Sequence, residues 1–209
     1  MLKFEATHQE QYSRGELLLR TMFGIFYIGL PHLICMIPFA IWGMILRFIT
    51  WWIILFTGKY PKDYFEYQVK LVRWSWRLTA RLSNLVDGYP AFGLNGTDDR
   101  TVYEVEYREP YGQGQLLLIT FFGQLMVLPH IFCLILMFLG AYFVVLIAFW
   151  VVLITGKYPM GMHNYMVGLN RWVARMGLYL QFMYPSYPPF SGKSDEDLKP
   201  TNPNILDAK

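Results

Sequence analysis

Apolar residues in this chain are gathered into two pairs of long stretches, and each pair is followed by a segment with helical periodicity. In the first pair, residues 15–30 would reach only about 24 Å as a helix, whereas residues 32–57 can cross a hydrocarbon core of about 30 Å. The second pair covers residues 114–128 and 130–155. In residues 63–86 polar side chains recur every three or four positions, which is typical of an amphipathic helix. The pattern predicts a helical membrane protein in two similar halves.

The two halves are copies of one sequence unit. Four motifs occur in the same order in both: Leu-Pro-His, Thr-Gly-Lys-Tyr-Pro, Arg-Trp and Tyr-Pro-x-Phe. They begin at Leu30, Thr57, Arg73 and Tyr89 and, 98 residues later, at Leu128, Thr155, Arg171 and Tyr187. Upstream of these motifs the offset is 99 residues, as in the pair Gly24 and Gly123. A tandem duplication therefore sets the domain organisation.

Each copy is expected to form a membrane hairpin. Pro31 and Pro129 interrupt the helical pattern between the short and the long segment, because proline lacks the amide hydrogen that a helix needs. Alternatively, the short segment lies in the interface, or dips in and returns, and only the long segment crosses. Matching basic segments favour one side of the membrane and therefore an even number of crossings per copy. We expect an all-α integral membrane fold of two hairpins, related by a pseudo-two-fold axis along the membrane normal, each followed by an amphipathic interfacial helix.

The copies are joined by a polar connection and followed by a polar tail. The expected divisions are a first membrane repeat at 1–93, a linker and lead-in at 94–110, a second membrane repeat at 111–192 and a disordered tail at 193–209. Residues 101–107 alternate apolar and polar side chains, which predicts a short strand. The N-terminal lead-in has a similar sequence, and the two lead-ins are predicted to pair.

Composition and charge support the membrane assignment. Apolar residues make up 55% and charged residues 16% of the chain, against roughly 45–50% and about 25% in soluble domains. The net charge of +3 is too small to indicate nucleic-acid binding. Residues 1–16 are polar and do not resemble a secretory signal, so insertion is expected to rely on the internal stretches. Positive residues near the span ends place both amphipathic helices and both termini in the cytoplasm.

Basic and aromatic residues of the amphipathic helices and of the turns before them form the predicted surface set. They are expected to contact anionic lipid headgroups or a partner, or simply to anchor the helices at the cytoplasmic face. The set consists of Lys59, Lys70, Arg73, Trp74, Arg77, Arg81, Lys157, Arg171, Trp172 and Arg175. Tyr-Pro-x-Phe is expected to end each helix and to pack it back onto the span.

The sharpest chemical pattern is His-x-x-Cys, which occurs as His32 with Cys35 and as His130 with Cys133. Residues three apart share a helix face, and the two pairs could converge about the two-fold axis as ligands of a soft metal such as zinc or copper. The alternative, which we favour, is that each histidine caps the turn after proline and each cysteine packs as a small apolar residue. The sequence indicates no cofactor otherwise.

Arg47 is a charge within the long apolar stretch of the first copy, and Val145 takes its place in the second. An arginine there costs at least about 2.5 kcal/mol on insertion scales, so it should face protein, water or a lipid headgroup. It could line a conduit, or it could snorkel to the surface or pair with a partner subunit.

The combined motifs resemble a bacterial membrane family, the domain of unknown function 4389 family. In that family an aromatic-rich span ends in a Thr-Gly-Arg/Lys-x-Pro turn, and a helix with Arg-Trp, a further arginine and a closing Tyr-Pro-Pro-Phe follow. Both copies carry this set, with Arg77 and Arg175 as the further arginines, and the first copy departs at Ala91, where the second has proline. The resemblance implies a bacterial membrane protein with two tandem copies and implies no activity.

These observations predict a non-enzymatic, oligomeric or accessory component of a membrane assembly in the bacterial inner membrane. Its partners would be membrane lipids and a membrane protein or further copies of the chain, and not nucleic acid. The sequence carries no glycine-rich phosphate loop, nucleophile elbow or His-Glu-x-x-His motif. The alternatives are a small transporter or channel-forming subunit with Arg47 in its conduit, and a membrane metal-binding protein that uses the His-x-x-Cys pairs.

Overall fold

The structure is a computed structural model that describes residues 1–108, 111–184 and 186–198. Most of these residues are helical, and two short strands form a two-stranded sheet. In chain order the elements are β1 (Leu2–Ala6), α1 (Arg14–Gly24), the π-helical turn η1 (Ile25–Gly29), α2 (Leu30–Thr57), α3 (Lys62–Leu82), β2 (Thr101–Val105), α4 (Gln113–Thr155) and α5 (Met160–Leu180).

Two continuous helices, which we call the long helices, carry most of the apolar residues. The first, Arg14–Thr57, joins α1, η1 and α2 over 44 residues, and the second is α4 with 43 residues. Both are long and apolar enough to cross a membrane. At about 1.5 Å per residue each is about 65 Å long. The hairpin turns predicted at Pro31 and Pro129 are wrong, because both prolines lie within continuous helix.

A π-helical turn carries the first long helix past Pro31. The Leu30 amide donates to the Ile25 carbonyl five residues before it, as in a π-helix. The first copy has one residue more than the second between Gly24 and Leu30, where the repeat offset changes, and a single π turn accommodates one such residue. The Tyr89 hydroxyl donates to the Tyr27 carbonyl, which lies four residues before Pro31 and has no proline amide to pair with.

The Thr-Gly-Lys-Tyr-Pro motif ends each long helix and starts the next. Gly58 and Gly156 adopt left-handed conformations with φ of 67° and 73°, which glycine allows without steric cost. The threonine before each glycine accepts a hydrogen bond from the lysine amide after it, at 3.2 Å in the first copy and 3.1 Å in the second. The proline then lies directly before α3 or α5 as its N-cap residue, where its missing amide hydrogen removes no helical hydrogen bond.

The strand register shows that the two copies are related by a pseudo-two-fold axis. In the antiparallel β1–β2 ribbon, Phe4 pairs with Tyr103, its own counterpart in the other copy. The predicted pairing of the two lead-ins is thereby confirmed. Phe4 and Tyr103 are both buried on one face of the ribbon, so the axis stands perpendicular to the ribbon.

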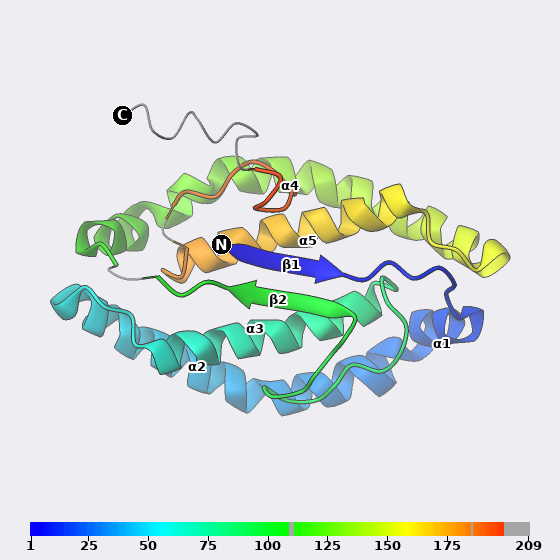
Figure 1. Cartoon of the computed structure of the whole chain (residues 1–209), viewed down its shortest axis with the longest axis horizontal. Coiled ribbons are helices and arrows are strands. Elements are labelled where there is room, and N and C mark those ends of the chain that lie inside the picture. Colours follow the sequence, from blue (N-terminus) through cyan, green and yellow to red (C-terminus); the bar gives the residue numbers. More distant parts are fainter. Residues whose placement is uncertain (109–110, 185, 199–209) are drawn as a thin grey trace.

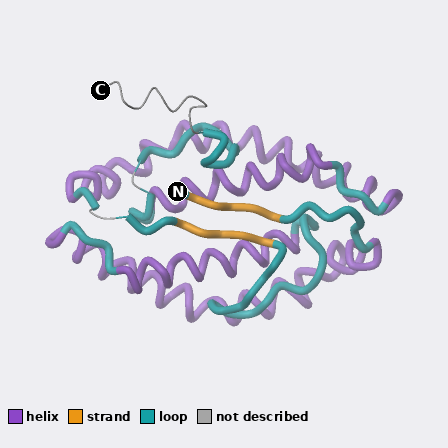
Figure 2. The backbone as a smooth tube through the Cα atoms, in the orientation of Figure 1, coloured by secondary structure: helices purple, strands orange, loops and turns teal. Residues whose placement is uncertain are grey.

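The other elements are arranged in pairs about this axis (Figure 1). The long helices run antiparallel along the two sides, α3 and α5 lie inside them, and the ribbon lies in the middle (Figure 2). The ends of the long helices meet: the Tyr12 amide donates to the Gly156 carbonyl at 2.8 Å, and the Tyr111 amide donates to the Gly58 carbonyl at 2.9 Å. At each end of the molecule, the segment before the long helix of one copy is therefore hydrogen-bonded to the turn after the long helix of the other.

The predicted disordered tail is ordered in its first part. Asp195 accepts hydrogen bonds from the Leu2 amide at 2.7 Å and from Arg175, whose side chain is fully buried. The prediction is therefore wrong for residues 193–198, because these residues cover the end of the ribbon and the arginine beneath it. Residues 199–209 lie outside the described residues.

Because the ribbon and both helix ends join the copies, two half-chains should assemble. We expect that residues 1–94 and 95–209, expressed together from separate reading frames, copurify in equal amounts through a tag on one of them. Pull-down in mild detergent with quantification of both fragments measures this. Each fragment expressed alone serves as the control and should be recovered poorly, because its half of the ribbon has no partner. Two fragments that purify independently and do not associate would contradict the intertwined arrangement.

Candidate functional site

Three of the repeated motifs meet at one cluster in each copy. In the first copy His32 is fully buried, its Nδ1 accepts a hydrogen bond from Trp74 Nε1 at 2.9 Å, and its ring stacks on Phe92 with centroids 3.8 Å apart. In the second copy His130 has the same relation to Trp172, at 2.8 Å, and to Phe190, at 3.8 Å. The prediction that Tyr-Pro-x-Phe packs back onto the long helix is confirmed, and histidine is what it packs against. The prediction that the motif ends each amphipathic helix is wrong, because α3 ends at Leu82 and α5 at Leu180, before the motif begins.

The histidine clusters do not form the predicted metal site. Since each tryptophan donates to Nδ1, the neutral ring carries its proton on Nε2, and Nε2 is buried without a hydrogen-bond partner in both clusters. The clusters belong to α2 and α4, which lie on opposite sides of the molecule (Figure 1). Among the described residues no three of His, Cys, Asp and Glu are grouped as ligands. His32, Cys35, His130 and Cys133 therefore do not converge, because the expected hairpins that would bring them together do not form.

Two matched arginines bind the loops that cover the amphipathic helices. Arg77 donates to the carbonyls of Gly93 and Gly96 at 2.6 and 2.8 Å, and Arg175 donates to the Ser191 carbonyl at 2.8 Å. Both side chains are fully buried. Burial lowers the pKa of the Arg77 guanidinium, while the nearby carboxylate of Asp98 opposes this shift. The basic face of each helix is therefore an internal surface that satisfies loop carbonyls.

A second matched pair of arginines holds the ribbon across the two copies. Arg73 Nε, from the first copy, donates to the carbonyl of Tyr103 at 2.9 Å. Arg171, from the second copy, donates through Nη2 to the carbonyl of Phe4 at 2.7 Å. Each copy thus fixes the strand that belongs to the other.

Arg81 forms a buried, two-bond contact with Asp98, at 2.5 and 2.8 Å. Burial by itself would raise the pKa of Asp98, but hydrogen bonds from Arg81, Thr101 and the Arg100 amide outweigh it and lower that pKa. The carboxylate therefore stays ionised and fixes the start of β2 to the end of α3.

The predicted lipid-contact set is largely internal. Lys59 and Lys157 are exposed, and Lys70, Arg73 and Arg171 are half-buried. The other five members are buried and donate within the chain, so the predicted headgroup contact does not hold for them: Trp74, Arg77, Arg81, Trp172 and Arg175. The physical reason is that the chain itself supplies the acceptors. These are loop carbonyls for Arg77 and Arg175, the Asp98 carboxylate for Arg81, and a histidine Nδ1 for each tryptophan.

Arg47 is half-buried on α2, and its charge acts on the phenol of the buried Tyr60. Burial raises the pKa of Tyr60, and Arg47 lowers it in part. Arg47 therefore lies near enough to the Tyr60 side chain for its charge to act on the phenol. Its role in a conduit stays a prediction.

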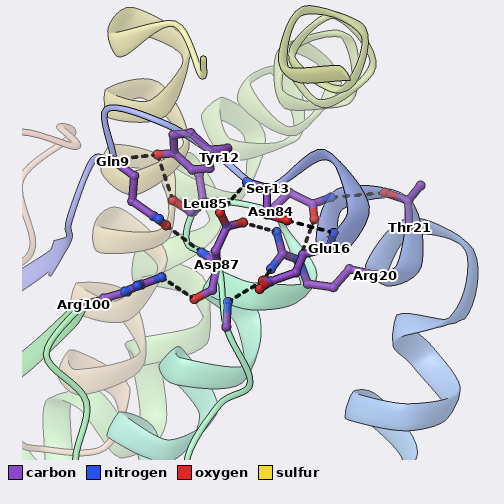
Figure 3. A network of polar contacts seen from close by, with 11 residues as sticks. Gln9, Tyr12, Ser13, Glu16, Arg20, Thr21, Asn84, Leu85, Asp87 and Arg100 are labelled. Carbon is purple, nitrogen blue, oxygen red and sulfur yellow. Dashed lines mark hydrogen bonds and ion pairs between the residues drawn. The ribbon is translucent and has the colours of Figure 1, made fainter. Parts of the chain in front are cut away.

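A buried charge network near the start of the first long helix escaped the sequence reasoning (Figure 3). Arg20 donates to Asp87 at 2.6 Å, to Glu16 at 2.8 Å and to Asn84 at 2.9 Å, and its side chain is 1% exposed. The second copy has Ile119 in place of Arg20. A comparison of charged positions between the copies could have found this network, because it is private to the first copy.

A histidine pair distinguishes one end of the molecule from the other. His163 is buried, and its ring lies 5.0 Å from that of His8, which contacts the Tyr158 carbonyl at 2.7 Å. Burial, together with the charge of His8, lowers the pKa of His163 to about 4. At the other end the matching positions are Tyr107 and Phe65, whose rings lie 5.1 Å apart. One end therefore contains two histidines where the other contains a tyrosine and a phenylalanine.

Both long helices expose large apolar side chains over most of their length, and we call this surface the apolar belt. It runs from Met22, 65% exposed, to Phe56, 74% exposed, in the first long helix, and from Phe121, 74% exposed, to Ile154, 70% exposed, in α4. α4 contains no Asp, Glu, Lys or Arg. Such continuous exposure exceeds what monomeric soluble proteins show and marks a membrane or partner surface.

The Arg20 network gives a first test of the buried charges. Arg20→Met should lower the free energy of unfolding by about 3–5 kcal/mol, because it leaves Asp87 buried without its cation. Denaturant unfolding in detergent micelles measures the change. The exposed residue Glu10 provides a control, since Glu10→Gln should stay within about 0.5 kcal/mol of the parent. An Arg20→Met protein as stable as the Glu10 control would show that the network is not stabilising.

The lowered pKa of His163 predicts a specific pH dependence. The folded pKa is about 4 and the unfolded pKa is 6.5, so the stability due to neutral His163 is complete above pH 6.5 and is lost as the pH falls toward 4. Between pH 7 and 5 this loss is about 2 kcal/mol. His163→Phe, which copies Phe65, should show a correspondingly smaller fall in unfolding free energy over this range. An equal fall in both proteins would exclude His163 as its source.

Comparison with known proteins supports the family resemblance in one copy. Residues 119–192, from within α4 to the loop after α5, match the family model described as Domain of unknown function (DUF4389). The match covers the histidine cluster, the Thr-Gly-Lys-Tyr-Pro turn and the arginines of the second copy. Neither the curated proteins nor the solved structures gave a significant match.

Proposed function

We propose that the chain is a non-enzymatic component of a membrane assembly in the bacterial inner membrane. In this proposal the long helices lie in lipid, both termini face the cytoplasm, and the ribbon and its covering loops meet a protein partner or further copies of the chain. The observation that carries the proposal is the apolar belt, because a surface of this length needs lipid or a membrane partner to cover it.

The polar side chains of the two copies bind other parts of the same chain, which supports a structural role for the protein. The buried and half-buried arginines and the histidine clusters bind backbone carbonyls and aromatic rings of the chain itself. They hold the loops and the ribbon in place at matched positions in both copies. A pair of rigid, intertwined repeats is suited to presenting surfaces to lipid and to partners.

Lipid contact through basic groups is proposed for the two exposed lysines. Lys59 and Lys157 follow the long helices at opposite ends of the molecule. Positive side chains at the ends of apolar helices attract anionic lipid headgroups and favour the cytoplasmic side. These two lysines are the members of the predicted basic set whose side chains are exposed.

Membrane fractionation tests the proposal. The protein should stay in the membrane fraction after an alkaline carbonate wash and should leave it only with detergent. Native mass measurement after mild detergent extraction should then show either a fixed partner or more than one copy of the chain. Release of the parent protein by the carbonate wash would contradict the proposal.

A charged pair on the apolar belt gives the matched variant. Phe132 and Leu136 are 68% and 58% exposed, so Phe132→Asp with Leu136→Asp should leave the fold intact. Each carboxylate should cost about 2.5–3.5 kcal/mol in lipid, and the carbonate-released fraction should rise several-fold. Thr97→Asp, in an exposed loop, is the control and should fractionate as the parent does. Equal release of both variants would mean that lipid does not cover the belt at these residues.

A further inference from the structure

We infer that the apolar belt is covered by the acyl chains of a single membrane leaflet, so that the long helices lie along the membrane and do not cross it. This inference rests on the proposed membrane function and specifies its geometry. It states which molecules cover the apolar belt and on which side of the membrane the polar groups lie.

The length of the long helices is the first argument. Each is about 65 Å long, which is about twice the hydrocarbon thickness of about 30 Å. The exposed apolar residues extend over nearly the whole helix, from Met22 to Phe56 in the first and from Phe121 to Ile154 in the second. A crossing helix of this length would hold about half of its apolar surface outside the hydrocarbon. A helix that lies in one leaflet keeps the whole belt in lipid.

The ribbon provides the second argument, because it fixes which direction faces water. Its buried face carries Phe4 and Tyr103, and its outer face carries the exposed charges Lys3, Glu5 and Glu104. The ribbon lies in the middle of the molecule, and the long helices extend across the view down the shortest axis (Figure 1). If these helices crossed the membrane, the charged ribbon would lie at the depth of the hydrocarbon. With the pseudo-two-fold axis along the membrane normal, the ribbon faces water and the long helices lie in the membrane plane.

The ends of the long helices give the third argument. Arg14 donates to the Ile154 carbonyl and so lies at the end of α4 together with Lys157, whereas Lys59 follows the end of α2. The two helix ends lie on opposite sides of the view (Figure 1), and all three side chains are exposed. In the single-leaflet arrangement these ends reach the same headgroup layer as the ribbon. Arg47 is then explained as well, since every residue of an in-plane helix lies near the headgroups and an arginine side chain can reach them.

Cysteine labelling of matched positions separates the two arrangements. In a background of Cys35→Ala and Cys133→Ala, the repeat counterparts Lys59→Cys and Lys157→Cys are made singly, with Glu104→Cys on the ribbon as a third variant. A membrane-impermeant maleimide is applied to inside-out vesicles and to intact right-side-out spheroplasts. We expect all three cysteines to label in the inside-out vesicles and to be protected in the spheroplasts.

Labelling of Lys59→Cys and Lys157→Cys from opposite sides would overturn the inference, because the two ends would then lie across the membrane from each other. Protection of Glu104→Cys in both preparations until detergent is added would also overturn it, even if the protein inserted in both orientations. Both outcomes leave the proposed membrane function intact. That function fails in a distinguishable way, when the carbonate wash removes the labelled protein from the vesicles.

Discussion

The structure depends on the pairing of Phe4 with Tyr103 at the pseudo-two-fold axis. These residues are counterparts in the two copies, so their pairing fixes the relation of every other element. Arg171 and Arg73 secure the pair by binding the same two residues' carbonyls from opposite sides. A hydrogen bond to a charged donor contributes about 1.5–3 kcal/mol, and an isolated two-stranded ribbon is marginal in water. The ribbon therefore exists because each copy binds the strand of the other.

The buried basic faces of α3 and α5 show what helical periodicity can and cannot reveal. The spacing of Arg73, Arg77 and Arg81 predicts a polar face correctly, and α3 forms as expected. It does not reveal whether that face meets water, phosphates or loop carbonyls, since all three accept hydrogen bonds from a guanidinium. The loops that follow each helix determine which acceptors the arginines meet, and the conformation of these loops cannot be read from a sequence period. The headgroup role was therefore predicted for side chains such as Arg77 that the fold keeps inside.

The repeat, the paired strands and the turns after the long helices were predictable, because duplication, alternation and glycine or proline positions each have a local physical cause. The continuous helices through Pro31 and Pro129 were not predictable, since the proline rule states the cost of the lost hydrogen bond but not which neighbouring groups offset it. In apolar surroundings neighbouring groups and π-helical adjustments satisfy the freed backbone, as Tyr89 and the turn Ile25–Gly29 do here. The network around Arg20 was missed because the position of a charged residue along the chain does not show that its side chain is buried. The available signal is that the second copy has Ile119, an uncharged residue, at the matching position.

The separation of 99 positions between Phe4 and Tyr103 affects the order of folding during synthesis. At about 5–20 residues per second, β1 leaves the ribosome several seconds before its partner strand exists. The arginine that will bind the Phe4 carbonyl, Arg171, is made later still. β1 therefore has an open edge until β2 is made, and its Lys3 and Glu5 side chains are the kind of charged residues that discourage pairing with other chains.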